Sequence, residues 1–299
     1  MYDFEIERIN DEIKKRKAKR VLIQLPEGLK AQAPDIMKQI KAETVLSADP
    51  CFGACDIITT PETDLTMHFG HIKMLDTKNI IYIETHSHLE VIPVIDKAIP
   101  LLKGTVGLVT TAQHLHKLKG MKQHLEEHGI KVVLGKTGLR TKPGHVLGCD
   151  FTSAINADAD MMLFVGSGKF HSLGVAYFTG KKTVQANPYD NSVEIVDASQ
   201  WEKEKWLRIS KAGNARSFGI IYGLKPGQKN FALADSLRKM SKENSHLIAL
   251  SSITPANIDY LPFDAFVITA CPRIVIDDWK NYRKPVLLPE EFKEIIKKK

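Results

Sequence analysis

Four cysteines are the residues of this 299-residue chain whose type and setting could do chemistry. Cys51 and Cys55 lie in the stretch ADPCFGACD, Cys149 lies in LGCD and Cys271 in TACPRI. Each stretch follows a short apolar run, and in parallel α/β proteins the functional loops lie beyond the carboxyl ends of the strands. The thiols are therefore candidates for a shared site. Four buried structural cysteines are the alternative, because cysteine is among the most buried residue types.

The spacing of the cysteines narrows the kind of metal centre. Structural zinc sites use close pairs such as C-x₂-C, and the sequence has none. An iron–sulfur loop of the form C-x₃-C-x₂-C is also absent, because Ile58 stands where the third cysteine would be. Three thiolates gathered from distant parts of the chain would suit an iron–sulfur cluster with one iron left open for a substrate.

Short apolar runs alternate with helical patterns along the whole chain, and these elements must position the cysteines. Runs this short and this apolar are typical of parallel strands covered by helices on both faces. The expected strands are 20–25, 44–47, 79–84, 105–110, 131–134, 145–148, 160–165, 217–222, 246–250, 265–269 and 285–288. The expected helices are 29–41, 114–128, 196–210 and 230–244. The pattern predicts an α/β protein with right-handed crossovers and small parallel sheets.

The same alternation of strands and helices occurs three times along the chain. It predicts three domains, each of a normal size for one folding unit. They span residues 1–103 with Cys55, 104–212 with Cys149 and 213–299 with Cys271. The helix at 196–210 is expected to end the second domain. Three similar units facing a common centre could bring three thiols together. One larger doubly wound sheet with a cap is the alternative.

Composition and charge exclude several classes of protein. The sequence is 43% hydrophobic and 26% charged, which is typical of a globular chain and not of a disordered or fibrous one. No apolar run approaches the ~20 residues of a membrane-spanning helix, and residues 1–20 form a charged amphipathic pattern and not a signal peptide. Four cysteines are too few for a disulfide scaffold. We expect a cytoplasmic protein without a membrane partner.

The net charge of +7 permits an acidic partner such as RNA, a ribosome or an acidic protein, without identifying one. Two basic runs, 14–20 and 297–299, are candidates for docking such a partner. A solvated surface is the alternative for each run, and it is the favoured one.

Seven motifs, spread over nearly the whole chain, together resemble a known family. They are LPEGL at 25–29, DPCFGACD at 49–56, HFGH at 68–71, GCD at 148–150, GSGKFHSLG at 166–174, NPY at 187–189 and ACPRI at 270–274. In this order they resemble the archaeal diphthamide synthase subunit, the non-classical radical S-adenosylmethionine enzyme of the first step of diphthamide biosynthesis. One departure is Ser172, which stands where the family pattern Phe-His-Pro has its proline.

The resemblance implies a fold and a cofactor. Members have three homologous Rossmann-like α/β domains in a triangular arrangement, each giving one cysteine to a central [4Fe–4S] cluster. Matched residue by residue, the family ligands fall on Cys55, Cys149 and Cys271. Cys51 is then a bystander.

The resemblance also implies a reaction and partners. Family members cleave the Cγ–S bond of S-adenosylmethionine and transfer the 3-amino-3-carboxypropyl radical to C2 of a histidine in translation elongation factor 2. The expected activity is thus 2-(3-amino-3-carboxypropyl)histidine synthase. Homodimers, an electron donor and no direct nucleic-acid partner are implied as well.

Loops at the strand ends supply candidates for holding S-adenosylmethionine, namely Glu27, Gly28, Gly166, Gly168 and Arg273. The glycines allow close approach of the backbone to a ligand, and Arg273 could bind a carboxylate bidentately. A helix cap is the alternative role for Glu27 and Gly28, and an ion pair with Asp277 or Asp278 is the alternative for Arg273. The segment 166–169 lacks the G-x₄-G-K-[ST] frame, which excludes nucleoside triphosphate hydrolysis.

His68, His71 and His171 are candidate proton acceptors for the proton that leaves imidazole C2. A structural role is the alternative for each of them. His86 and His88 form an i, i+2 pair that could bind zinc, but the sequence offers no evident third ligand.

Two other functions are also compatible with the sequence. A quinolinate-synthase-like iron–sulfur dehydratase would share the fold and the cluster. A non-catalytic basic α/β module that binds RNA would contain no iron.

Overall fold

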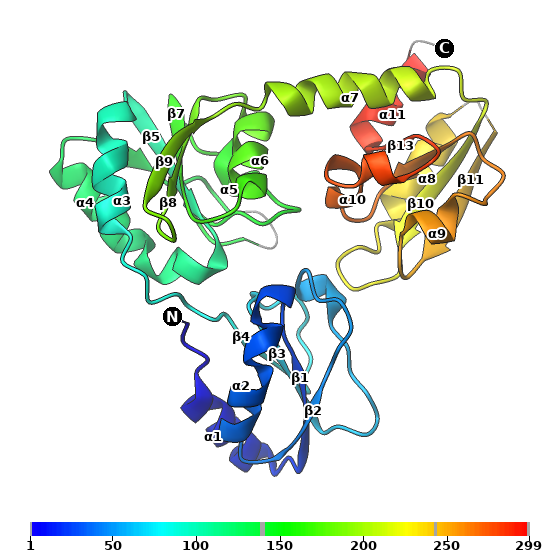
Figure 1. The fold of residues 1–299 in the computed structure, drawn as a ribbon. Coiled ribbons are helices and arrows are strands. Elements are labelled where there is room, and N and C mark those ends of the chain that lie inside the picture. Colours follow the sequence, from blue (N-terminus) through cyan, green and yellow to red (C-terminus); the bar gives the residue numbers. More distant parts are fainter. Residues whose placement is uncertain (1, 138–140, 242–243, 298–299) are drawn as a thin grey trace. The chain divides into compact units, whose positions relative to one another are not determined.

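The chain is described by a computed structural model over residues 2–137, 141–241 and 244–297. Its strands form three sheets, and Figure 1 shows the course of the chain through them. The predicted α/β class is confirmed, since 12 of the strands named below are joined by parallel pairing and only the last strand of the second sheet is antiparallel.

The first sheet has the strand order β2-β1-β3-β4. Its strands are β1 (Arg20–Gln24), β2 (Glu43–Leu46), β3 (Leu65–Phe69) and β4 (Ile80–Ile83), and its helices are α1 (Ile6–Arg16), η1 (Glu27–Gln32), α2 (Ala33–Gln39) and η2 (Ala54–Asp56). Alternate strand residues such as Ile23 and Met67 pack against Ile9 of α1 and Ile36 of α2. Because side chains alternate along a strand, the residues between them, including Gln24 and His68, face the opposite side.

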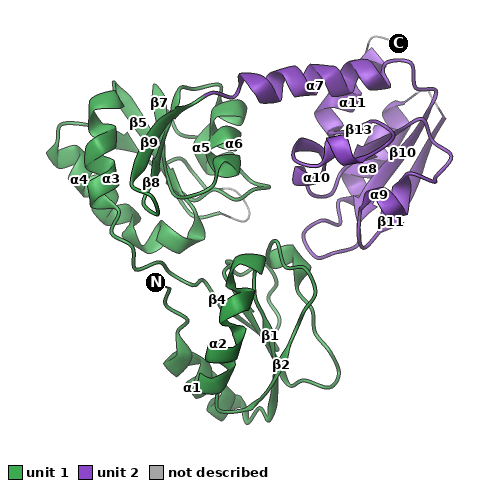
Figure 2. Ribbon diagram, viewed as in Figure 1, with its two compact units in different colours: residues 1–196 green, residues 197–299 purple. Residues whose placement is uncertain are grey.

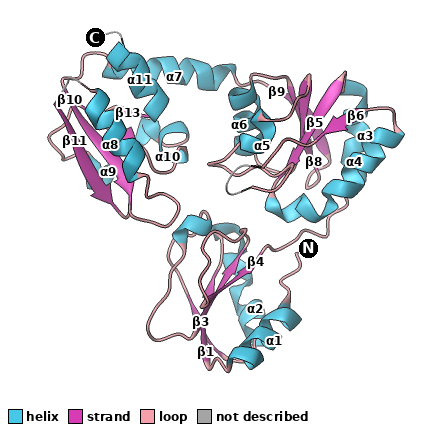
Figure 3. Cartoon of the chain, turned by 180° about the vertical axis from the view of Figure 1, so that it is seen from behind, coloured by secondary structure: helices cyan, strands magenta, loops and turns pink. Residues whose placement is uncertain are grey.

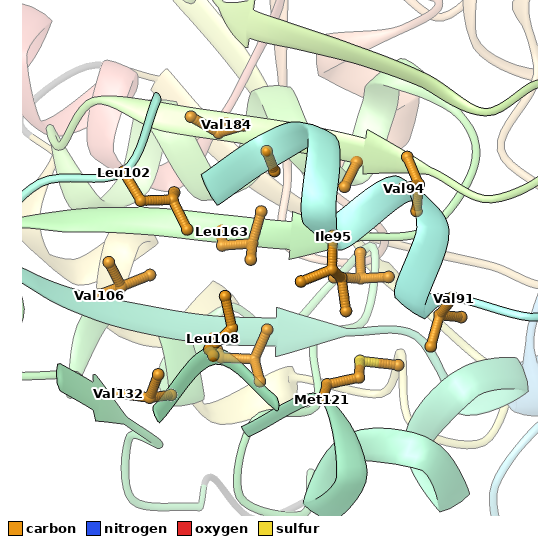
Figure 4. Packing of buried hydrophobic residues seen from close by; sticks show 14 of the residues in the cluster. Val91, Val94, Ile95, Leu102, Val106, Leu108, Met121, Val132, Leu163 and Val184 are labelled. Carbon is orange, nitrogen blue, oxygen red and sulfur yellow. The ribbon is translucent and has the colours of Figure 1, made fainter. Parts of the chain in front are cut away.

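The second sheet has the order β6-β5-β7-β8-β9. Its strands are β5 (Thr105–Thr110), β6 (Lys131–Val133), β7 (Met161–Val165), β8 (Thr183–Asn187) and β9 (Ser192–Val196). Its helices are α3 (Ile92–Ala98), η3 (Ile99–Leu101), η4 (Ala112–Lys117), α4 (Leu118–Glu127), α5 (Thr152–Ile155) and α6 (Lys169–Thr179). Figure 4 shows Ile95 of α3 and Met121 of α4 packed against Leu108 and Leu163 of the central strands. This apolar layer holds the central strands in place, and the Cys149 loop is attached to the end of one of them, β5.

The third sheet has the order β11-β10-β12-β13, which is the same order as in the first sheet. Its strands are β10 (Ser217–Gly223), β11 (Asn244–Leu250), β12 (Ala265–Ile268) and β13 (Val286–Leu287). Its helices are α7 (Ser199–Ala212), α8 (Phe231–Met240), α9 (Pro255–Ile258), α10 (Arg273–Ile276), η5 (Trp279–Asn281) and α11 (Pro289–Lys297). Phe218 and Val267 of the strands pack with Leu237 of α8 and Phe292 of α11.

The three sheets are built by the same rule. In each, the first strand in sequence lies between the second and the third, and the fourth follows the third. Figure 3 shows the strands of each sheet gathered beside their own helices. This repeated order supports the expected threefold repetition of one α/β unit.

The chain divides into two compact units, residues 1–196 and 197–299 (Figure 2). The first unit holds two sheets, and hydrogen bonds link the segments between them, including Ser87 N–H to the Gln113 carbonyl at 2.8 Å and Gln113 Nε2 to the Gly70 carbonyl at 3.0 Å. The three-domain division and the border at 103/104 stay predictions, whereas the compact unit of the third sheet begins at residue 197 and not at 213.

Helix α7 was expected at the end of the second domain, and this expectation was wrong. Its residues Ile209 and Ala212 belong to the core of the third sheet together with Phe292. Arg208 of α7 also pairs with Glu291 of α11. The helix therefore belongs to the compact unit of the third sheet, because its apolar residues pack in that core and its buried arginine has its ion-pair partner there.

The strand predictions failed at four places. Strands β3, β8 and β9 were not expected, and the expected strand 145–148 is not a strand. That segment forms isolated bridges only, pairing Thr110 with His145 and Leu147 with Asp150. The second bridge is a tight reversal that ends any extended run at Gly148.

Candidate functional site

Three of the cysteines lie at the carboxyl ends of parallel strands, one for each sheet. Cys55 is in η2, between β2 and β3, and Cys149 lies between β6 and β7, which is the equivalent place in the second sheet. Cys271 follows β12, the third strand of its sheet, and is therefore not equivalent to the other two. Because all strands of one parallel sheet end at the same edge, each thiol lies at the functional edge of its own sheet.

Exposure separates these three cysteines from the fourth. Cys55 and Cys271 are half-buried and Cys149 is exposed, whereas Cys51 is 1% exposed. Burial, followed by the nearby Asp56 carboxylate, raises the pKa of the Cys51 thiol to about 12. Cys51 is thus a protonated thiol at neutral pH, and the accessible thiols are the other three.

The loop that carries Cys55 is held by Asp56. One carboxylate oxygen, Oδ2, accepts hydrogen bonds from Phe52 N–H at 2.8 Å and Gly53 N–H at 3.1 Å. The Gln24 side chain donates to the Asp56 carbonyl at 2.5 Å. These bonds fix the turn around Cys55 onto the end of β1.

The loop that carries Cys149 is fixed to the end of β5. Thr110 N–H donates to the Gly144 carbonyl at 2.8 Å, and Val146 N–H donates to the Thr110 carbonyl at 3.0 Å. Leu147 N–H donates to the Asp150 carbonyl at 2.9 Å, which closes a turn with Cys149 inside it.

The loop that carries Cys271 continues β12 into α10. Thr269 N–H donates to the Ile221 carbonyl at 2.9 Å, which extends the pairing with β10 beyond the strand. The Cys271 carbonyl accepts from Ile274 N–H at 3.2 Å, so this cysteine begins the first turn of the helix.

His68 and His71 lie together in the first sheet. His68 Nε2 is 3.0 Å from His71 Nδ1, and His68 Nδ1 is 2.9 Å from Gln24 Oε1. Burial lowers the pKa of His68 to about 3 and that of His71 to about 4. Both rings are neutral at pH 7, and their assignment as proton acceptors stays a prediction.

His171 lies in a different setting on α6. Its ring is stacked on Phe164, with ring centroids 6.0 Å apart and an interplanar angle of 9°, and it meets Phe170 edge-on. It is half-buried. Its predicted role as a proton acceptor also stays a prediction.

The candidate ligand-binding residues differ in how the structure uses them. Glu27 Oε1 accepts from Lys30 Nζ at 2.6 Å and from Cys51 N–H at 3.3 Å, so Glu27 braces the cysteine loop. At Gly28 an added Cβ would meet nothing within 4 Å. Gly168 has a φ of +81° at the start of α6 and an added Cβ there would also meet nothing within 4 Å. Backbone conformation therefore requires glycine at 168 and not at 28.

Gly166 and Arg273 are also committed to local contacts. An added Cβ at Gly166 would lie 3.0 Å from the ring of Phe164. Arg273 Nε donates to Asp277 Oδ2 at 2.8 Å, one helical turn away. This is the ion pair that was the alternative role expected for Arg273. The pKa of Asp277 is raised by burial, although the arginine opposes this rise.

Two sets of residues were missed by reasoning from the sequence. The ring nitrogens of His114 and His145 are buried without a hydrogen-bond partner among the described residues. Cys51, His68 and His71 place potential metal-ligand atoms within 4.8 Å of one another. The recurrence of Cys and His in the matched motifs was the only available signal for the second set. His86 and His88 belong to neither potential metal group of the described residues.

The basic runs are engaged in surface ion pairs where they are described. Arg16 pairs with Glu12, Arg20 with Glu43, and Lys297 with Glu294. The rest of the terminal run, 298–299, lies outside the described residues. Among the described helices, none is long and apolar enough to cross a membrane.

Known proteins of one family resemble this chain over nearly its whole length. The family model "Putative diphthamide synthesis protein" matches residues 25–299. The 2-(3-amino-3-carboxypropyl)histidine synthase of Pyrococcus horikoshii is 34% identical over 95% of this chain and 88% of its own length. The enzyme of the same name from Methanocaldococcus jannaschii is 30% identical over 99% of this chain and 91% of its own length.

Solved structures agree with the sequence comparisons. The crystal structure of Dph2 from Pyrococcus horikoshii matches with a TM-score of 0.89 and 32% identity, over 100% of this chain and 92% of that chain. A second crystal structure of that protein, with a 4Fe-4S cluster, matches equally well. A family model that covers nearly the whole chain, together with relatives of this similarity, shows that the chain belongs to the diphthamide synthesis protein family.

Proposed function

We propose that this chain is a 2-(3-amino-3-carboxypropyl)histidine synthase, the activity for which its archaeal relatives are named. The observation that carries the proposal is the division of the cysteines into three and one. Cys55, Cys149 and Cys271 each lie at the carboxyl edge of a different sheet and reach the surface, whereas Cys51 is buried.

The three accessible cysteines are the proposed ligands of a [4Fe–4S] cluster. Their chemistry fits the cluster, because thiolates are its usual ligands and all three side chains are thiols outside any disulfide. Bound through three thiolates, such a cluster supplies a reducing electron and one iron left open to a substrate. The relative with a 4Fe-4S cluster supports this choice. The proposal includes three domains in a triangular arrangement around the cluster.

The substrate proposed for the open side is S-adenosylmethionine, whose 3-amino-3-carboxypropyl group is transferred to a histidine of translation elongation factor 2. The left-handed backbone at Gly168 and the start of α6 can approach the ligand closely. Arg273 would bind the methionine carboxylate by exchanging it for its present partner Asp277. Which C–S bond breaks would follow from which bond these residues align with the cluster.

We further propose a cytoplasmic homodimer that receives its electron from a separate donor. No direct nucleic-acid partner is included. These statements rest on the family resemblance.

Iron content tests the ligand set. Protein purified without oxygen should be brown and contain about four irons per chain, as one [4Fe–4S] cluster requires. Alanine at 55, 149 or 271 should each abolish cluster assembly, and Cys51→Ala should retain it. A colourless, iron-free wild-type protein would instead favour a non-catalytic basic module. Loss of iron in Cys51→Ala with retention in Cys55→Ala would show that the wrong member of the pair was chosen.

A further inference from the structure

A second group of metal-ligand side chains lies in the first sheet, beside the loop that carries Cys55. The thiol of Cys51 and one ring nitrogen each of His68 and His71 all lie within 4.8 Å of one another. The two ring nitrogens, His68 Nε2 and His71 Nδ1, are 3.0 Å apart. Three ligand atoms this close can share one ion of the size of Zn²⁺, whose bonds to nitrogen and sulfur are about 2.0–2.3 Å long.

The hydrogen bonds around His68 set its tautomer. Gln24 donates through Nε2 to the Asp56 carbonyl at 2.5 Å, so its oxygen is the atom that faces His68 Nδ1 at 2.9 Å. His68 therefore carries its proton on Nδ1 and presents the lone pair of Nε2 toward His71. A histidine that binds a metal almost always donates its other ring N–H to an oxygen in this way. Gln24 and His68 are also paired in the β1–β3 register, which fixes the ring.

His71 lies just after β3, with 3.0 Å between its Nδ1 and His68 Nε2. Because His68 Nε2 presents a lone pair, His71 Nδ1 carries the proton of this hydrogen bond in the metal-free chain. A bound ion would take the place of this proton between the two nitrogens.

Charge is balanced inside this buried group. Cys51 is 1% and His68 0% exposed, so an isolated dication would be costly to place there. Asp56 is 6% exposed and its carboxylate acts electrostatically on both Cys51 and His71. A thiolate at Cys51 and the carboxylate of Asp56 together offset the two charges of a divalent ion.

We propose that Cys51, His68 and His71 form a mononuclear site for a divalent transition-metal ion, with zinc as the ion that such a Cys-His-His set suits best. Binding forms one metal–sulfur and two metal–nitrogen bonds. The thiol proton of Cys51 passes to solvent, and the proton of His71 Nδ1 moves to Nε2 of the same ring, so that the imidazole stays neutral. The ion would fasten loop 48–56 to the end of β3 and so position Cys55. The site uses none of the three cysteines proposed for the cluster.

Another potential group provides an internal control. Asp96, His124 and His128 also lie within 4.8 Å of one another, but Asp96 and His128 are exposed and no thiol is present. Metal bound at this second group would show no sulfur-to-metal charge-transfer band.

Cobalt titration of the full chain tests the proposal. The protein carries Cys55→Ser, Cys149→Ser and Cys271→Ser, which remove the thiols proposed for the cluster, and Co²⁺ replaces Zn²⁺ as a coloured probe. We expect one cobalt per chain with a thiolate charge-transfer band, displaced by zinc. Cys51→Ser should abolish the band, and Gln24→Leu should weaken affinity about 10-fold. His128→Ala should change neither.

A second measurement guards against variants that fail to fold. Wild-type protein isolated without oxygen should contain one zinc per chain besides its iron, and Cys51→Ser should lose the zinc and keep the iron. Absence of zinc from the wild type together with absence of a thiolate band in the cobalt titration would overturn the site. Loss of the band in His128→Ala would overturn it too. Iron content reports separately on the proposed function, so the two failures are distinguishable.

Discussion

Arg208 of α7 and Glu291 of α11 form a buried ion pair that joins the two helices, with side-chain exposures of 4% and 1% and 2.5 Å between Arg208 Nη2 and Glu291 Oε1. Arg208 Nε lies 3.2 Å from both carboxylate oxygens, and Leu288 N–H donates to Oε2 at 3.0 Å. Both side chains are buried, so neither charge can be stabilised by solvent if its partner is removed.

Removal of one partner should therefore destabilise the unit of the third sheet. Glu291→Ala leaves a buried guanidinium without its counter-charge, and we expect the free energy of unfolding to fall by about 3–5 kcal/mol. Glu290→Ala, one residue earlier and exposed, should change it by less than about 0.5 kcal/mol. Urea unfolding of both variants measures the difference, and equal effects would contradict the role given to the pair.

Gly135 should not tolerate a side chain, because the backbone of the segment after Cys149 packs directly against it. A Cβ there would lie 1.8 Å from the Ser153 carbonyl, which is backbone and cannot move aside. Ser153 Oγ also bridges Gly144 N–H at 2.8 Å and the Gly135 carbonyl at 3.1 Å, just after Cys149.

Gly135→Ala should thus lower both thermal stability and iron content. Gly120→Ala is the matched control, since a Cβ at this position in the first turn of α4 would meet nothing within 4 Å. It should stabilise the helix by about 0.5–1 kcal/mol. Thermal melting with iron analysis measures both, and wild-type values for Gly135→Ala would show that the loop packs differently.

His145 should make stability depend on pH. Burial lowers its pKa from 6.5 to about 4, and neither ring nitrogen has a hydrogen-bond partner among the described residues. Below pH 6.5 the imidazole is protonated in the unfolded chain but stays neutral in the folded chain. The free energy of unfolding therefore falls as the pH drops from 6.5 toward 4. At pH 5 the loss is about 2 kcal/mol for this one imidazole.

His145→Leu should therefore lose less stability than the wild type between pH 7 and pH 5. His128→Leu, at an exposed position, should behave like the wild type. Urea unfolding at the two pH values gives the comparison. Identical pH dependence in His145→Leu and the wild type would contradict the buried neutral imidazole.

Arg273 offers a test of the binding of S-adenosylmethionine. If it binds the substrate carboxylate, Arg273→Ala should raise KM about 10-fold or more with unchanged iron content. Asp277→Ala removes only the helical ion pair and should leave KM unchanged or lower. Steady-state kinetics with an iron assay separates the two roles, because a purely structural pair would make both variants behave alike.

The sequence allowed most strands to be predicted where an unbroken apolar run signals burial on both faces. Strands β3 and β8 were missed because buried polar residues interrupt their runs: Thr66 and His68 in β3, and Thr183 and Gln185 in β8. Their polar groups are satisfied by partners distant in sequence, such as Gln24 for His68, which local patterns do not reveal.

The candidate site was predictable to the extent that the cysteines follow strands. The grouping of Cys51 with two histidines was not, because it depends on the pairing of β1 with β3. The position of α7 also depends on a contact with α11 across 83 residues of sequence. Both features therefore depend on contacts between residues that are distant in the sequence, which local patterns do not reveal.

Product analysis tests the central proposal most directly. Anaerobic protein with its cluster, dithionite, S-adenosylmethionine and elongation factor 2 should give methylthioadenosine and one 3-amino-3-carboxypropyl group on a single histidine of the factor. The protein with Cys55→Ala, Cys149→Ala and Cys271→Ala is the control and should give neither product. Release of 5′-deoxyadenosine as the main product, formation of quinolinate from its precursors, or an unmodified factor would contradict the proposed reaction.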